Sequence, residues 1–210
     1  MKFSRNIRNI FEEYFKPDEI IIKMRKKIGV YNTSRSDYVK RKKEKLKNEL
    51  GLYEEDFHIA LLKEFESAFE TKDGEMIEYL IISLALWEGT LSESNEDRYN
   101  YFIDILNKLV ICDWHKGNED IVNFLQDIAD EKSIDYLYRA VSLDLEYLAW
   151  DTENYTFKVK CVKAIREIGR KIGLDRVIDT LNLLCDNENS IVREVAEQSI
   201  EKLKNREKRY

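Results

Sequence analysis

The sequence has little of the two residue types that interrupt helices. Among its 210 residues are one proline and seven glycines. Because these residues mark turns and loops, their scarcity, together with 36% charged residues, is typical of a helix-rich chain with short connections. No segment of any length alternates apolar and polar residues with a period of two, and we therefore expect no β-sheet.

Long apolar runs and a regular cysteine framework are also missing. No run of eighteen apolar residues is present, so we expect no membrane-spanning helix and no membrane partner. The first residues lack the apolar core of a signal peptide, which predicts a cytoplasmic protein. The cysteines are odd in number and widely spaced, and we interpret them as reduced core residues rather than disulfides or metal ligands. They are Cys112, Cys161 and Cys185.

Residues suited to catalysis are few. The chain has two histidines and lacks a Ser-His-Asp order, a glycine-rich phosphate loop and a CxxC pair. His115 and Glu119 have the i, i+4 spacing of a metal-binding pair, but Gly117 lies between them and no third ligand is evident. His58 lies in an apolar helical pattern and is interpreted as structural. We therefore expect no catalytic residues, no metal and no cofactor.

Charge is distributed unevenly along the chain. Residues 1–50 hold 15 Lys or Arg against 7 Asp or Glu, whereas residues 51–210 hold 20 against 34. We predict a basic helical extension over residues 1–50, packed on or flanking an acidic helical domain over residues 51–210. The lysine-rich helix expected at 37–50 either contacts phosphate backbones or is a solvated face that pairs with the acidic domain. Elsewhere we expect no nucleic-acid contact.

Apolar residues at helical spacing, with glycines at or beside the boundaries, define a series of helices after residue 50. The predicted helices cover about 56–71, 75–87, 97–112, 118–129, 133–145, 154–169, 174–185 and 189–205.

Two segments 35 residues apart share one pattern, and this repeat is the clearest feature of the chain. Residues 151–169 align with residues 186–203, each segment starting with Asp151 or Asp186. These aspartates are expected in turns, where they accept hydrogen bonds from backbone N–H groups. Apolar and small residues at equivalent positions form one helix face in each copy. The faces are Phe157, Cys161, Ala164, Ile165 and Ile168, and Val192, Ala196, Ser199, Ile200 and Leu203.

The pattern of an aspartate, then Val192-Arg193, Ala196 and Ile200, is similar to that of HEAT and HEAT-like repeats. The resemblance covers about 132–204, with conservative departures in the first copy, and leaves out residues 1–50. It implies an all-α fold, a right-handed α-solenoid of about nine to eleven helices stacked as antiparallel pairs, with a concave binding surface. The segment from Asp113 to Val122 also resembles bacterial HEAT-repeat proteins that are often encoded beside polymorphic toxins and regarded as immunity proteins.

Each tryptophan has an acidic neighbour near an expected turn. Asp113-Trp114 and Trp150-Asp151 are one repeat apart, so a solenoid would align them along one edge. They form either an aromatic and acidic ridge for a partner or plugs between successive helix pairs. The candidate partner-binding residues, beside which Glu146 lies, are Asp113, Trp114, His115, Glu119, Asp120, Asp144, Tyr147, Trp150, Asp151 and Tyr155.

Three functions are compatible with these features. The first is a non-enzymatic protein-binding module whose acidic surface engages a basic partner, such as a toxin that it neutralises. The second is a HEAT-like DNA glycosylase for alkylated bases, in which Trp114, Asp113, Trp150 and Asp151 would hold the lesion. The net negative charge after residue 50 argues against this second function, because DNA phosphates require a basic surface. The third is a general scaffold.

Overall fold

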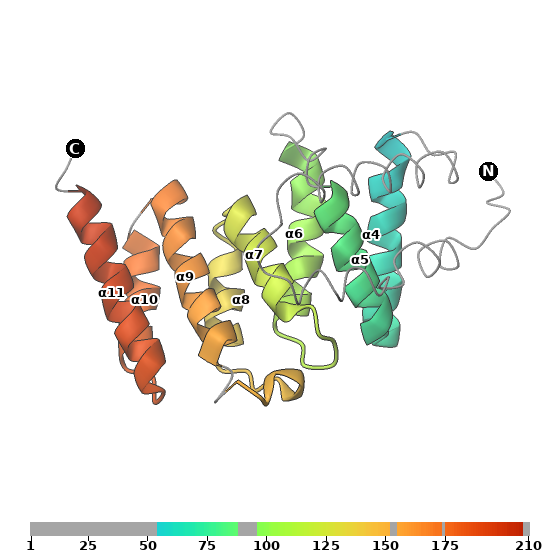
Figure 1. The fold of residues 1–210 in the computed structure, drawn as a ribbon. Helices are drawn as coiled ribbons and strands as arrows, with labels where there is room; N and C mark the ends of the chain where they lie inside the picture. Colours follow the sequence, from blue (N-terminus) through green and yellow to red (C-terminus); the bar gives the residue numbers. More distant parts are fainter. Residues whose placement is uncertain (1–53, 88–95, 152–154, 174, 208–210) are drawn as a thin grey trace, which may run out of the picture. The chain divides into compact units, whose positions relative to one another are not determined.

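The structure, a computed structural model, describes residues 54–87, 96–151, 155–173 and 175–207, and it is all-helical over these ranges (Figure 1). Eight α-helices and one short 3₁₀ helix lie within them, with no strand, which confirms the all-α prediction for this part of the chain. The chain divides into two compact units, Met1–Arg98 and Tyr99–Tyr210. The predicted extension over 1–50, its basic helix at 37–50 and the predicted boundary after residue 50 lie outside the described residues.

In the first unit, α4 (Glu54–Thr71) and α5 (Gly74–Trp87) pack against each other as a helical hairpin. The apolar spacing predicted both helices, at about 56–71 and 75–87. Buried apolar side chains of these two helices include Leu61, Phe65, Ala68, Met76, Ile77, Tyr79, Leu80, Ile81 and Leu84.

The turn of this hairpin depends on a residue in the left-handed conformation. Lys72 has φ 52°, and its N–H donates to the carbonyl of Phe69 at 3.2 Å. The next N–H, of Asp73, donates to the carbonyl of Ala68 at 2.9 Å, so two of the last four carbonyls of α4 are satisfied. The carboxylate of Asp73 then accepts from the N–H of Met76 at 3.1 Å, which caps α5.

The division between the units falls near the start of α6, so the second unit holds most of this helix and all later ones. These elements are α6 (Glu96–Val110), α7 (Asn118–Ile128), α8 (Ser133–Ala140), the 3₁₀ helix η3 (Glu146–Leu148), α9 (Tyr155–Ile172), α10 (Asp175–Cys185) and α11 (Ser190–Glu207).

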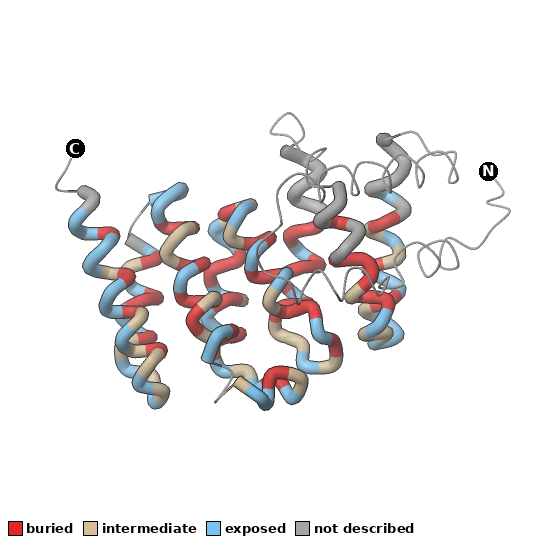
Figure 2. The backbone as a smooth tube through the Cα atoms, viewed as in Figure 1, coloured by how far each residue is buried: buried red, intermediate tan, exposed pale blue. Residues whose placement is uncertain are grey.

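Helices of the second unit pack in two layers. Helix α9 contacts α7, α8, α10 and α11, and α10 contacts α8 and α11. In Figure 1, α7, α9 and α11 form the nearer layer, with α8 and α10 behind them. Buried residues line the sides of the helices that face their neighbours (Figure 2). The predicted repeat faces belong to this core. In the first copy, all five face residues are 0% exposed, namely Phe157, Cys161, Ala164, Ile165 and Ile168. In the second copy, four of five are buried and Ile200 is half-buried.

Two details differ from the sequence prediction. Helix α8 ends at Ala140, although Val141 and Leu145 continue the apolar spacing. Both are buried, because the chain folds back after the helix and Leu145 is extended, with φ −95° and ψ 111°. Gly169 was expected to end α9, yet the helix continues to Ile172.

Gly169 instead marks a close approach between two helices. A Cβ atom at this position would lie 2.6 Å from Cγ1 of Val177 on α10. The glycine therefore permits the tight packing of α9 against α10. Gly173, with φ +120°, follows the end of α9, where only glycine adopts such a conformation without strain.

Only one of the three cysteines is the core residue that the sequence predicted. Cys161 is buried in the core, whereas Cys112 and Cys185 are half-buried, and all three are free thiols. Over the described ranges, no helix combines the length and apolar character needed to cross a membrane.

Candidate functional site

The loop between α6 and α7, residues 111–117, is held in place by His115. This side chain is 2% exposed, and its Nε2 lies 3.0 Å from the carbonyl oxygen of Leu109. Its Nδ1 accepts from the N–H of Gly117 at 3.1 Å. Nδ1 must therefore be unprotonated, and Nε2–H donates to the carbonyl, so the ring is neutral. Burial lowers the pKa of His115, against opposing effects of the Leu109 carbonyl and of Asp113.

His115 thus lies apart from the surface on which it was predicted. Both ring nitrogens are engaged inside the protein, and the ring contacts the edge of Trp114, with centroids 5.1 Å apart. Trp114 is half-buried, and Asp113 is exposed. The sequence gives no direct indication of these bonds, because they depend on how the loop closes against the end of α6.

Asn118, the first residue of α7, is the central polar residue of this region, and it was not among the predicted site residues. It is 0% exposed. Its amide donates to the carbonyls of Val110 at 3.2 Å and Cys112 at 2.7 Å. Its oxygen accepts from the hydroxyl of Tyr147 at 3.4 Å, 29 residues later. The only sequence indication was the Gly117-Asn118 pair as a helix start, which says nothing of the distant bond.

Tyr147 joins the segment 141–151 to the start of α7. It lies in η3 and is half-buried. Burial, and then the carboxylates of Glu119 and Asp120, raise the pKa of Tyr147, against the backbone N–H groups of Glu119 and Asn118. The residue is therefore a neutral phenol that can donate to the Asn118 oxygen. The predicted neighbourhood of Tyr147, Glu119 and Asp120 is present in the structure.

Two lysines of α9 tie the same region together. Lys160 pairs with Glu119 at 2.7 Å, and Lys158 pairs with Asp144 at 3.1 Å. One lysine therefore reaches the start of α7 and the other reaches the segment after α8. The side chain of Asp144 remains 83% exposed despite its ion pair.

Trp150 is the most exposed large apolar side chain of the described residues, with 78% of its surface in water. The residue after it is fixed in two ways: the N–H of Asp151 donates to the carbonyl of Leu148 at 2.8 Å, and its carboxylate accepts from the N–H of Thr156 at 2.6 Å. This second bond caps the start of α9, as the sequence predicted for an aspartate in this turn. Tyr155, the first residue of α9, is 40% exposed. The interpretation of Trp150 as a buried plug is therefore wrong.

We call the surface built by these residues the aromatic–acidic edge. It lies at the lower end of the helices in Figure 1, where the loops 111–117 and 141–151 run. The edge carries six acidic side chains against Lys116, Lys158 and Lys160, an excess of three carboxylates. It comprises Asp113, Trp114, Glu119, Asp120, Asp144, Glu146, Tyr147, Trp150, Asp151 and Tyr155.

The acidic character belongs to this edge rather than to the whole second unit. Residues 51–98 hold 3 basic and 13 acidic residues, whereas residues 99–210 hold 17 and 21. Helix α9 alone contains six Lys or Arg and a single Glu. The excess of carboxylates at the edge therefore contrasts with a basic helix directly beside it.

Several groups at or near the edge that could take part in chemistry are already engaged or buried. His115 has no free nitrogen, and Glu119 is paired with Lys160. Burial raises the pKa of the Cys161 thiol, which makes it a poor nucleophile. In the ranges that the structure describes, no group of three His, Cys, Asp or Glu side chains is placed to hold a metal ion. The glycosylase hypothesis also assigned Asp151 to a DNA lesion, but its carboxylate caps α9.

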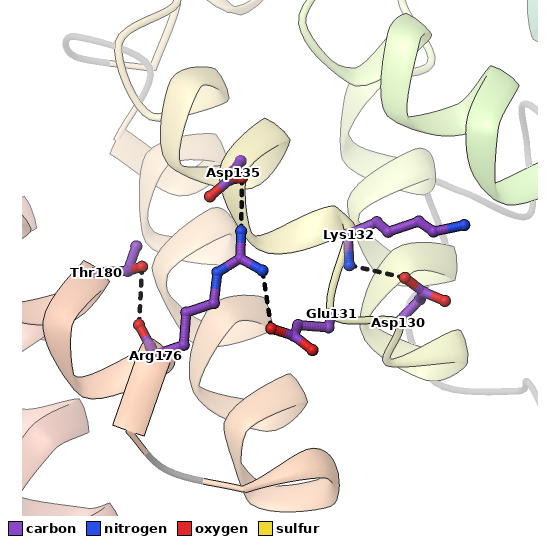
Figure 3. Close-up of polar contacts among 6 residues, drawn as sticks. All are labelled: Asp130, Glu131, Lys132, Asp135, Arg176 and Thr180. Atoms are coloured by element: carbon purple, nitrogen blue, oxygen red, sulfur yellow. Dashed lines mark hydrogen bonds and ion pairs between the residues drawn. The ribbon is translucent and has the colours of Figure 1, made fainter.

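A second polar cluster braces α10 against the α7–α8 turn (Figure 3). Arg176 pairs with Glu131 at 2.8 Å and with Asp135 at 2.7 Å. The hydrogen bond to Glu131, and after it the charge of Asp135, raise the pKa of Arg176. Beside it, Lys171 donates to the carbonyl of Asp127 at 2.7 Å, at the end of α7. These contacts join residues more than 40 positions apart and are interpreted as structural.

Scans of the chain against protein-family models, curated proteins and solved structures found no match.

Proposed function

We propose that residues 99–210 form a protein-binding module and that the aromatic–acidic edge engages a basic protein partner without catalysing a reaction. The observation that carries this proposal is the 78% exposure of Trp150 on an anchored segment. Burying the exposed part of an indole of this kind is worth about 3–4 kcal/mol, which folding alone leaves unused and a partner can recover. Tryptophan is also among the residues that most often dominate interface energies.

The electrostatics of the edge support a basic partner. Asp144 and Glu146 lie within six residues of Trp150 and are exposed. Carboxylates around an apolar anchor accelerate encounter with a cationic surface and disfavour anionic partners such as DNA. The anchoring bonds of Tyr147 and Asp151 hold the segment in one conformation, which lowers the entropy cost of binding.

We further propose that the second unit is a right-handed α-solenoid of HEAT-like helix pairs. This proposal is supported by the 35-residue repeat and by the packing of α9 on both α7 and α11. In such a fold the loops of successive pairs align along one edge, which accounts for the neighbouring positions of the segments 111–118 and 141–151.

A more specific form of the proposal names the partner as a cationic toxin, such as a nuclease, that this protein neutralises by covering its active site. Its support is the sequence resemblance of residues 113–122 to presumed immunity proteins. Co-production of a toxin encoded by a neighbouring gene tests it: wild-type protein restores growth, and Trp150→Ala weakens the rescue. Equal rescue by both proteins would contradict the role of the edge.

Site-specific crosslinking in the native host tests the module itself. A photoreactive benzoylphenylalanine replaces Ala149, which is exposed beside Trp150, and in a matched control it replaces Ile172, which is 45% exposed at the far end of α9. We expect position 149, and not position 172, to capture a protein with an excess of Lys and Arg. The purified partner should bind Trp150→Ala at least tenfold more weakly than Ile172→Ala, since loss of a central tryptophan at an interface costs about 2 kcal/mol or more. Capture at both positions alike, or of an acidic protein, overturns the proposal.

A further inference from the structure

We propose that the edge recognises an arginine of its partner, whose guanidinium stacks on the exposed indole of Trp150 while its N–H groups bond to neighbouring carboxylates. This inference rests on the proposed function and gives the chemistry of its central contact. It concerns Trp150, Asp144, Glu146 and Tyr155.

The combination of an exposed aromatic face and exposed carboxylates in one short segment favours a planar cation. Residues 144–151 contain Asp144, Glu146 and Asp151 together with Trp150. The indole face carries negative charge density and attracts a cation. A guanidinium is flat, is weakly hydrated and presents five donors in its plane, so it can stack and bond to carboxylates at once. A lysine ammonium is a compact and strongly hydrated charge that meets only one of these requirements well.

The carboxylates near Trp150 have acceptor capacity to spare. Asp144 pairs with Lys158 through one oxygen, yet its side chain is 83% exposed. Glu146 is exposed at the start of η3. Asp151, in contrast, is half-buried and uses its Oδ2 on the N–H of Thr156, so we assign it to positioning of the segment.

The two lysines of α9 at the edge do not cover the indole ring of Trp150. Lys158 and Lys160 point to Asp144 and Glu119, at 3.1 and 2.7 Å. The exposure of Trp150 shows that neither side chain covers its ring. The fold therefore leaves the aromatic surface open while it satisfies its own lysines elsewhere.

Titration of the full chain with short peptides tests the inference. Three peptides of equal length carry two arginines, two lysines or two citrullines, and the indole N–H signal of Trp150 is followed by NMR, with its assignment taken from Trp150→Phe. We expect the arginine peptide to shift this signal most at low salt and the neutral citrulline peptide least. Trp150→Leu should weaken binding of the arginine peptide roughly two- to fivefold, the size of an exposed cation–π contact. Ile172→Ala is the control and should bind as wild type does.

Three results would overturn the inference. They are equal affinity for the arginine and lysine peptides, equal binding by Trp150→Leu and wild type, or binding that leaves the Trp150 signal in place. Each leaves the proposed function intact when crosslinking at position 149 still captures a basic protein. Failure of that crosslinking overturns the proposed function independently.

Discussion

Substitution of Asn118 by alanine should be among the most destabilising single changes in the second unit. The side chain is 0% exposed and satisfies the carbonyls of Val110 and Cys112 as well as the hydroxyl of Tyr147. The change leaves two carbonyl oxygens and one hydroxyl without this partner. Each buried group left unsatisfied costs about 1–3 kcal/mol, so we expect a loss of about 3–5 kcal/mol. This is a large part of the 5–15 kcal/mol by which a domain is typically stable.

Three companion variants separate the contributions to this loss. Asn118→Asp keeps the shape but places an acceptor against two carbonyl oxygens, so it should destabilise at least as much as alanine. Tyr147→Phe removes a half-buried hydroxyl whose bond to Asn118 is long, at 3.4 Å, and should cost about 1 kcal/mol. Asn123→Ala, an exposed asparagine of the same helix, should change stability by less than about 0.5 kcal/mol.

Urea denaturation followed by far-UV circular dichroism measures these differences in the free energy of unfolding. Asn118→Ala and Tyr147→Phe should combine less than additively, because both remove the same bond. An Asn118→Ala protein within 1 kcal/mol of wild type, or a well-tolerated Asn118→Asp, would falsify the assigned role of this residue.

Further substitutions address single local features, and urea denaturation measures each. Gly169→Ala should cost about 1–2 kcal/mol, because the clash with Val177 exceeds the gain in helix propensity, and a variant as stable as wild type would contradict the close approach of α9 to α10. Lys72→Gly should stabilise the protein by about 1 kcal/mol, since the residue has φ 52°; a loss of stability would contradict this. His115 has a pKa below its ordinary 6.5, so the unfolded chain binds more protons as the pH falls. Stability is therefore full above pH 6.5 and declines as the pH falls toward the lower folded pKa, and His115→Gln should lose less between pH 8 and 5 than wild type does.

The helices and the core faces of the second unit could be predicted because they depend on local pattern. The repeat faces needed only the spacing of Phe157 and its equivalents. The helix starts needed only asparagine, aspartate and glycine at the expected places. Periodicity failed at Val141 and Leu145, where a folded-back loop buries residues at helical spacing without a helix. Apolar spacing predicted the burial of these two residues correctly, but it does not by itself show that they lie in a helix.

The polar framework of the edge could not be predicted, because its partners lie far apart in sequence. Tyr147 bonds to Asn118 across 29 residues, and Lys160 reaches Glu119 across 41. Such pairs follow from the packing of α9 on α7 and from the position of η3 beside the start of α7, which no single segment determines. The sequence did name Tyr147 and Glu119 among the residues of one surface, but it could not separate His115, which is buried, from its exposed neighbours.

Trp114 and Trp150 differ in exposure, and the residue that follows each of them has different contacts. At Trp114, the next residue is His115, which turns into the protein and draws the indole against its ring at 5.1 Å. At Trp150, the next residue is Asp151, which turns toward the N–H of Thr156 and leaves the indole outside. A tryptophan next to an aspartate is therefore half-buried in one loop and exposed in the other.

Substitutions should therefore distinguish the structural role of Asp151 from the binding role of Trp150. Trp150→Ala removes a side chain that is mostly exposed, so it should change stability by less than about 0.5 kcal/mol while it weakens partner binding. Asp151→Ala removes the cap of α9 and should cost about 1 kcal/mol of stability, and it should also weaken binding because the position of Trp150 is no longer fixed. Urea denaturation and partner affinity, measured on both variants, check this. If Trp150→Ala destabilised the fold as much as Asp151→Ala does, the indole would be a structural residue and the edge would lose its central contact.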